Sequence, residues 1–193
     1  MKSQNKNYCN IISFENIILA WKKARKGKTK KQYVLEFEKE LFYNLLAIHY
    51  ELRYRSYMLK PLTKFTIRDP KTRIIHKSNF RDRIVHHALV QILEPLFNKT
   101  FICDSCANRI GKGNLFALKR FERFQRKVTQ NYTQEGFCLK ADIKHYFQEV
   151  DHTILMNLIT RKINDKQTLE LVRKINANFE SQREREYFRE VCH

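Results

Sequence analysis

The chain has few residues that break regular structure: its 193 positions include only 4 glycines and 3 prolines. With 14 phenylalanines and 9 tyrosines available for a core, this argues against a low-complexity or collagen-like chain. No apolar run reaches the ~18 residues that a membrane span needs. The first residues also lack the continuous apolar stretch of a secretory signal. We therefore expect one globular domain, or two small ones sharing a core, in the cytoplasm and without a membrane.

Cysteine is present as five residues, an odd number that disfavours a disulfide framework in a chain without an export signal. Cys103 and Cys106 form a Cys-x-x-Cys pair, but no second pair follows at the spacing of a zinc site. Cys138, or Cys192 with His193, would have to complete such a site. Thiols that serve as small packing residues are the favoured alternative.

Acidic residues are scarce, with 20 Asp and Glu against 38 Lys and Arg and a net charge of +18. A charge of this size attracts polyanions, so nucleic acid is the expected partner and a merely solubilising surface the alternative. The excess lies in residues 1–135, whereas residues 136–193 carry 10 basic and 9 acidic side chains. The basic part should bind phosphate, and carboxylates with a chemical role should lie in the last part.

Apolar residues recur at helical spacing in the first 50 positions. The spacing predicts a helix over 14–21, capped by Ser13, and another over 34–48, joined by the basic run 22–31. Residues 57–77 interleave apolar and polar side chains around Asp69 and Pro70, a pair that favours a turn. This segment is predicted to form a β-hairpin with a basic tip.

The later part of the chain is again mostly helical in pattern. We expect helices over 82–97, ending near Pro95, and over 114–128, then a short strand over 137–143 with an acidic end. Two further helices should begin at Asp151 and Asp165, whereas 180–193 shows no apolar face. Helices combined with a hairpin and a strand predict an α+β fold.

Asp142 lies where the predicted strand ends, in the segment Leu-Lys-Ala-Asp-Ile-Lys-His-Tyr-Phe-Gln-Glu-Val-Asp-His at 139–152. A carboxylate at a strand end is rigidly held and could bind Mg²⁺, which prefers hard oxygen ligands. The other interpretation is that Asp142 caps the following turn. The segment alone does not separate the two.

Residues 139–152 resemble the first catalytic motif of reverse transcriptases, in the lineage of group II intron, retron and diversity-generating retroelement enzymes. Upstream blocks agree in order. Residues 66–75 resemble the fingers hairpin, 80–89 the following helix, and 104–113 the loop before the palm helix. Residues 14–28 and 33–46 are similar to the amino-terminal extension of the lineage, so the resemblance covers about 11–176.

The resemblance implies the fingers and incomplete palm of a right-hand polymerase with an amino-terminal helical extension. The extension would span 1–56, the fingers-like region 57–135 and the start of the palm 136–178. Residues 179–193 form a charged tail of uncertain assignment.

The resemblance also implies roles for residues of the last part. Asp142 would be a catalytic, metal-binding aspartate, with the backbone carbonyl of Ile143 as a neighbouring ligand for Mg²⁺ or, in its place, Mn²⁺. Phe147 matches the steric gate that lies under the sugar of the incoming deoxynucleotide.

Four basic residues of the fingers-like region match substrate contacts. Arg73 and Lys71 match residues that hold the triphosphate, a role suited to guanidinium because it meets phosphate oxygens bidentately. Arg109 and Lys112 would line the template path. A solvated hairpin tip for Lys71, and a solvated loop for Arg109 and Lys112, are the alternatives.

The chain departs from the family pattern in one chemically decisive respect. Two-metal phosphoryl transfer needs several carboxylates, and the sequence contains no Asp-Asp pair such as the family's Tyr-x-Asp-Asp turn. We expect an RNA-directed DNA polymerase fragment that is inactive alone. Its partners would be an RNA template, an RNA–DNA duplex, deoxynucleoside triphosphates and a complementing palm and thumb chain. The alternative is a non-catalytic, maturase-like or domesticated RNA-binding module.

Overall fold

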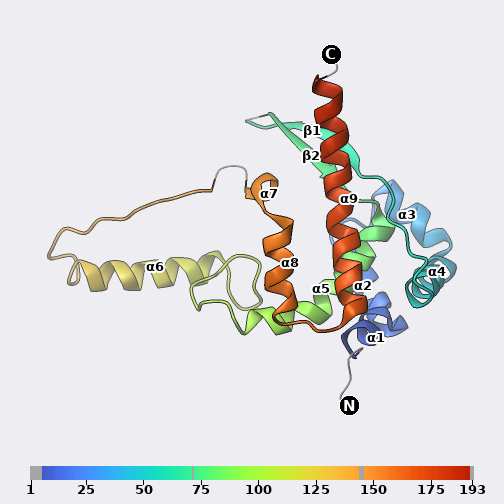
Figure 1. Ribbon diagram of the computed structural model, residues 1–193. Coiled ribbons are helices and arrows are strands. Elements are labelled where there is room, and N and C mark those ends of the chain that lie inside the picture. Colours follow the sequence, from blue (N-terminus) through green and yellow to red (C-terminus); the bar gives the residue numbers. More distant parts are fainter. Residues whose placement is uncertain (1–5, 71, 144–145, 192–193) are drawn as a thin grey trace. The chain divides into compact units, whose positions relative to one another are not determined.

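The computed structural model describes residues 6–70, 72–143 and 146–191, with the backbone alone for 73, 147, 148 and 179–191. The first part of the chain forms the helices α1 (Lys6–Ile12), α2 (Phe14–Arg25), α3 (Gln32–Lys39) and α4 (Leu41–Arg53) (Figure 1). The hairpin β1 (Thr63–Arg68) and β2 (Thr72–Lys77) follows. The remaining elements are α5 (Phe80–Asn98), α6 (Asn114–Val128), α7 (Tyr146–Glu149), α8 (His152–Thr160) and α9 (Lys166–Val191). Helices with one small sheet are compatible with the expected α+β class.

The chain divides into two compact units. Unit 1 comprises residues 1–94 and 152–193, and unit 2 comprises residues 95–151. Among the described side chains, nearly all of the buried ones belong to unit 1, and unit 2 buries only Thr129. The hydrophobic core is therefore that of unit 1. The domain boundaries expected at residues 56, 135 and 178 stay predictions.

The core of unit 1 forms where the amino-terminal helices meet. Ile11, Ile17 and Ile48, from α1, α2 and α4, are each fully buried. The Ser13 hydroxyl accepts a hydrogen bond from the Asn16 backbone N–H at 3.2 Å, so the predicted cap of α2 is confirmed. Burying these three isoleucine side chains contributes about 1.5–3 kcal/mol each.

The helix predicted over 34–48 is two helices, because the backbone leaves helical geometry at Glu40 with φ −122° and ψ 43°. A break of this kind leaves carbonyl groups without helical partners. The Asn44 side chain donates to the Phe37 carbonyl oxygen at 2.8 Å and satisfies one of them. The apolar spacing predicted the helical segments correctly, but not the bend between them.

The predicted hairpin is confirmed, with strands β1 and β2 antiparallel and Phe65 paired with Ile75. Helix α5 begins soon after it and continues through Pro95 to Asn98, one residue beyond the range of 82–97 that we expected. Proline lacks the N–H that a helix interior requires, and α5 ends within a turn after it. No helix in the described part of the chain combines the length and the apolar character that crossing a membrane requires.

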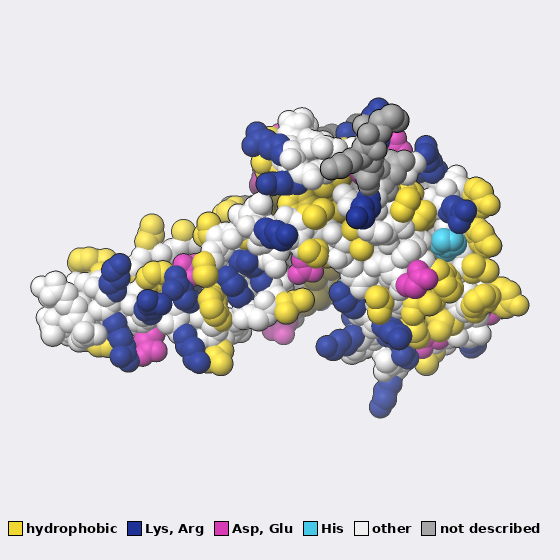
Figure 2. Space-filling view, turned by 90° about the horizontal axis from the view of Figure 1, so that it is seen from below, with side chains coloured by type: hydrophobic (Ala, Val, Ile, Leu, Met, Phe, Trp, Pro, Cys, Tyr) yellow, Lys and Arg dark blue, Asp and Glu magenta, His cyan; other side chains and the backbone are white. Residues whose placement is uncertain are grey.

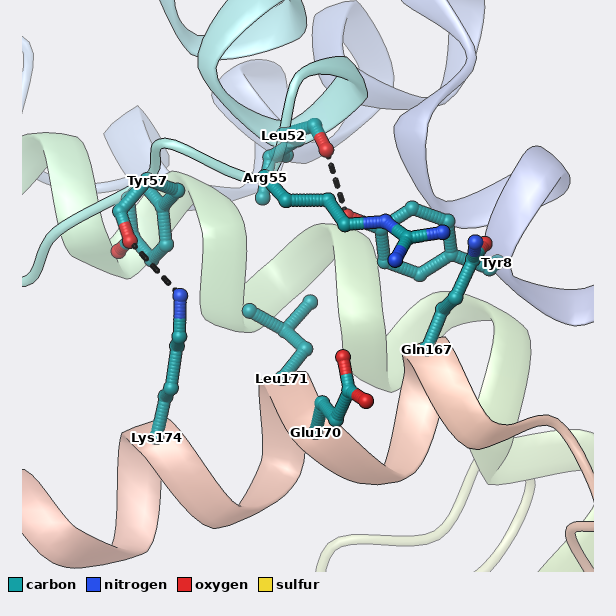
Figure 3. A pocket seen from close by; sticks show the side chains of 8 residues that line it. All are labelled: Tyr8, Leu52, Arg55, Tyr57, Gln167, Glu170, Leu171 and Lys174. Atoms are coloured by element: carbon teal, nitrogen blue, oxygen red, sulfur yellow. Dashed lines mark hydrogen bonds between the residues drawn. The ribbon is translucent and has the colours of Figure 1, made fainter.

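Helix α9 packs against the amino-terminal helices of unit 1. The carboxylate of Asp165, just before α9, accepts a hydrogen bond from the Tyr8 N–H at 2.7 Å. Further along α9, the Lys174 ammonium donates to the Tyr57 carbonyl oxygen at 3.4 Å (Figure 3). Between these contacts lies a cavity of about 30 Å³, lined in part by Arg55 and Glu170. This is room for about one water molecule, not for a substrate.

Unit 2 differs from the prediction at residues 137–143, which form no strand. A strand needs a hydrogen-bonded neighbour, and none of the described residues pairs with this segment. Its apolar side chains are open to solvent, with Phe137 97% and Leu139 92% exposed. The expectation of a strand over 137–143 was therefore wrong for this chain.

Candidate nucleic-acid interface

The β1–β2 hairpin presents its residues to solvent. Every residue of β1 is exposed, and β1 carries Lys64 and Arg68. Arg73 pairs with Ile67 in the register, but its side chain lies outside the described residues. Lys71 lies outside them altogether. The triphosphate roles of Arg73 and Lys71 therefore stay predictions.

Aromatic and cationic side chains hold the base of the hairpin to α3 and α5. The Lys77 ammonium lies 4.1 Å from the Tyr33 ring centre, and the Arg83 guanidinium lies 4.9 Å from it. The Phe80 ring contacts the rings of Tyr33 and Phe37 at centroid distances of 5.8 and 5.2 Å. Cation–π contacts contribute about 0.5–2 kcal/mol each, so this cluster fixes the hairpin while keeping two positive charges at its base.

The electrostatic field around Tyr33 is positive. Burial would raise the pKa of this phenol, but Arg83, Lys77 and Lys28 favour its anionic form and together lower its pKa below the usual value. The pKa of the nearby His87 is shifted by some of the same charges. Burial, followed by the charges of Lys23, Lys28 and Arg83, lowers the pKa of His87. Such a field attracts anions.

A basic hollow lies on unit 1 between α2 and α5. It has a volume of about 490 Å³ and is lined in part by Lys22 and Lys23 of α2, by Lys26 just after that helix, and by Gln91 of α5. These lysines belong to the basic run 22–31, which the sequence singled out as a helix connection. Open, lysine-lined surfaces suit phosphate groups better than apolar ligands.

Asp82 holds the segment 57–60, which precedes the β1–β2 hairpin. Its side chain is fully buried at the start of α5 and accepts hydrogen bonds from the Tyr57 hydroxyl at 2.8 Å and the Lys60 N–H at 2.9 Å. Burial, and then the charge and hydrogen bond of Asp82, raise the pKa of Tyr57 far above its usual value. Arg81 donates to Glu51 and, at 3.2 Å, to the Met58 carbonyl oxygen. Sequence reasoning missed this anchor because Tyr57 and Asp82 are 25 positions apart.

Arg109 holds together the loop between α5 and α6 through several hydrogen bonds. Its guanidinium donates to the Asn98 side-chain oxygen at 2.6 Å and to the carbonyl oxygens of Ile102 at 2.8 Å and Ser105 at 3.0 Å. Lys112 donates to the carbonyl oxygen of Cys103. Both cations thus stabilise the loop, and their contact with a template stays a prediction.

Helix α6 carries two different faces. Its apolar side chains are exposed, including Leu118 at 64% and Phe121 at 50%, and no residue of the helix is buried. Basic side chains recur on the other face, and Figure 2 shows Lys and Arg among apolar side chains in the region that holds α6. Phe121 and Phe124 line one side of a groove of about 300 Å³, and residues 136–139 line the other.

Asp142 lies on the exposed segment that precedes α7, and Ile143 beside it is 68% exposed. The backbone of Phe147 belongs to α7, but its side chain is outside the described residues. Within the described residues, no group of three or more His, Cys, Asp or Glu side chains is arranged to hold a metal ion. Asp142 and the Ile143 carbonyl could supply part of a Mg²⁺ coordination shell, and further oxygen ligands would have to join them.

The described cysteines, Cys9, Cys103, Cys106 and Cys138, are free thiols. Cys106 donates to the Asp104 carbonyl oxygen at 3.1 Å, and Cys9, Cys103 and Cys138 are exposed. Their expected role as packing residues does not fit three exposed thiols.

The chain is similar to several curated proteins. It is 28% identical over 93 residues, 48% of this chain, to nuclear intron maturase 1, mitochondrial, of Arabidopsis thaliana. It is 29% identical over 100 residues, 51% of this chain, to an uncharacterised 91 kDa protein in cob intron of Schizosaccharomyces pombe. An uncharacterised mitochondrial protein of Marchantia polymorpha is 27% identical over 94 residues, 49% of this chain.

Each match covers about 12% of the relative's own length. Comparison with protein-family models gives no match. The similarities therefore link about half of this chain to a protein named as an intron maturase, to a protein in the cob intron and to an uncharacterised mitochondrial protein.

Proposed function

We propose that this chain binds RNA through its basic surfaces, as part of a protein of the maturase-like, reverse-transcriptase-related lineage. The observation that carries the proposal is the surplus of positive charge that the fold leaves on its surface. The hairpin base, the hollow beside α2 and the outer face of α6 are all basic. Similarity to a protein named as an intron maturase supports RNA as the polyanion.

RNA binding is tested by titrating a labelled RNA with the chain at several salt concentrations. Each neutralised phosphate releases counterions, so affinity should fall at least tenfold between about 50 and 200 mM salt. Fluorescence anisotropy measures the dissociation constant at each concentration. An affinity that does not change with salt would contradict the proposal.

We also propose a second function, nucleotidyl transfer, on the basis of residues 139–152 and the ordered blocks before them. Asp142 and the Ile143 carbonyl would supply part of a Mg²⁺ site, and the metal would activate the primer hydroxyl and stabilise the leaving pyrophosphate. Arg73 and Lys71 would orient the triphosphate, and Phe147 would exclude a ribose 2′-hydroxyl. Further carboxylates would come from another polypeptide segment.

The second function predicts no primer extension by this chain alone. Asp142 is a single exposed carboxylate, and one carboxylate alone does not complete a site for two metal ions. Extension of a primer on an RNA template, with Mg²⁺ or Mn²⁺, measures the activity. Extension that disappears in Asp142→Ala would overturn the prediction of inactivity. RNA affinity should be the same in Asp142→Ala and in the unmodified chain.

A further inference from the structure

Three cations of α6 form one row along the helix. Lys119, Arg123 and Lys127 follow one another at intervals of four residues, so they share one side of the helix. With a rise of 1.5 Å per residue, neighbouring members are about 6 Å apart along the axis. All three are exposed. The row therefore presents regularly spaced positive charges along about two turns.

The other two cations of α6 are already neutralised by carboxylates of unit 2. Arg120 forms a bidentate pair with Asp104, with 2.8 Å between the Nη2 and Oδ2 atoms. Arg126 pairs with Glu122 at 2.6 Å. The hydrogen bond from Arg120 lowers the pKa of the Asp104 carboxyl below its usual value.

The carboxylates of Asp104 and Glu122 are thus engaged with Arg120 and Arg126. No hydrogen bond or ion pair in the described structure involves the side chains of the row. Holding three unneutralised cations in register costs electrostatic energy that a polyanion would recover. The centre of the row lies about 150° around the helix from Phe121 and Val128, so occupying the row leaves that apolar stripe free.

We propose that the row of Lys119, Arg123 and Lys127 binds consecutive phosphate groups of one RNA strand. The proposal rests on the proposed RNA binding and assigns it a surface. The step between neighbouring cations is similar to the step between neighbouring phosphates, whereas carboxylates of an acidic peptide have no such fixed repeat. Contacts to phosphates alone give binding that does not depend on base sequence.

The test compares two triple variants with equal loss of charge. One neutralises the row, as Lys119→Gln, Arg123→Gln and Lys127→Gln. The control neutralises three exposed cations that are scattered over α3, α4 and α9, as Lys39→Gln, Arg53→Gln and Lys166→Gln. Glutamine has a helix propensity close to that of lysine and arginine, so both variants should fold.

For the row variant, the slope of log affinity against log salt should fall by about 2, since each single-strand phosphate contact contributes about 0.7. Its affinity at about 0.1 M salt should fall at least tenfold. The control should retain a slope close to that of the unmodified chain. Equal slopes and affinities in the two variants would overturn the assignment of the row, while RNA binding itself would still stand.

Protection from acetylation gives a second measurement on the unmodified chain. Bound RNA should protect Lys119 and Lys127 from acetylation, detected by mass spectrometry, and leave Lys39 and Lys166 reactive. Equal protection by polyglutamate at the same charge concentration would overturn the phosphate assignment. If the unmodified chain does not bind RNA at all, the proposed function fails together with the row.

Discussion

Substitution Asp82→Ala should lower the free energy of unfolding by about 3 kcal/mol, because it leaves buried donors without their acceptor. The carboxylate is fully buried and accepts hydrogen bonds from the Tyr57 hydroxyl and the Lys60 N–H, with the Arg81 guanidinium at 3.4 Å. The Tyr57 hydroxyl has no water to replace this partner, since Tyr57 is 2% exposed. Urea denaturation, followed by circular dichroism, measures the change.

Asp69→Ala is the matched control for this substitution, because Asp69 is an exposed carboxylate in the turn of the hairpin. Its effect should stay within about 0.5 kcal/mol. Hydrogen exchange at the Lys60 amide should accelerate in Asp82→Ala and not in Asp69→Ala. Equal stabilities of the two variants would contradict the role of Asp82 as the anchor of the hairpin.

Asp165→Ala should cost about 2–3 kcal/mol, because one carboxylate both caps α9 and joins it to α1. Its Oδ2 atom accepts from the Tyr8 N–H and, at 2.9 Å, from the Thr168 hydroxyl. Its Oδ1 atom accepts from the N–H groups of Gln167 at 3.1 Å and Thr168 at 3.4 Å. Asp165 is 3% exposed, so water cannot easily replace these contacts.

Thermal denaturation measures the loss of stability in Asp165→Ala. Lys166→Ala, at an exposed position in the same helix turn, is the control. Asp165→Asn keeps one acceptor oxygen and should lie between the alanine variant and the unmodified chain. If Asp165→Ala were as stable as Lys166→Ala, the connection between α9 and the amino-terminal helices would contribute little to stability.

Local patterns in the sequence predicted most elements of the fold. Ser13 and the apolar residues after it predicted α2, and Asp69 with Pro70 predicted the turn of the hairpin. The helices expected to begin at Asp151 and Asp165 start at the next residue in each case. Caps and apolar spacing act over a few residues, so they can be read directly from the sequence.

Features that depend on distant residues could not be predicted in this way. The strand expected over 137–143 needs a partner strand, and the residues of the segment itself cannot supply one. The roles of Asp82 and Asp165 depend on Tyr57 and Tyr8, which are remote in sequence. For the candidate interface, the sequence predicted the basic character, whereas the distinction between paired and free cations on α6 needed the side-chain positions.

The contact between Tyr8 and Asp165 joins residues that are 157 positions apart, which has a consequence for folding during synthesis. Helices α1 to α4 leave the ribosome long before α9 exists, and all of unit 2 is translated between them. The nascent chain must therefore hold α1 without its contacts to Asp165 and α9 while residues 95–151 emerge. Late, long-range closure slows folding and exposes apolar surface, so we expect nascent chains shorter than about 165 residues to be the species that chaperones retain.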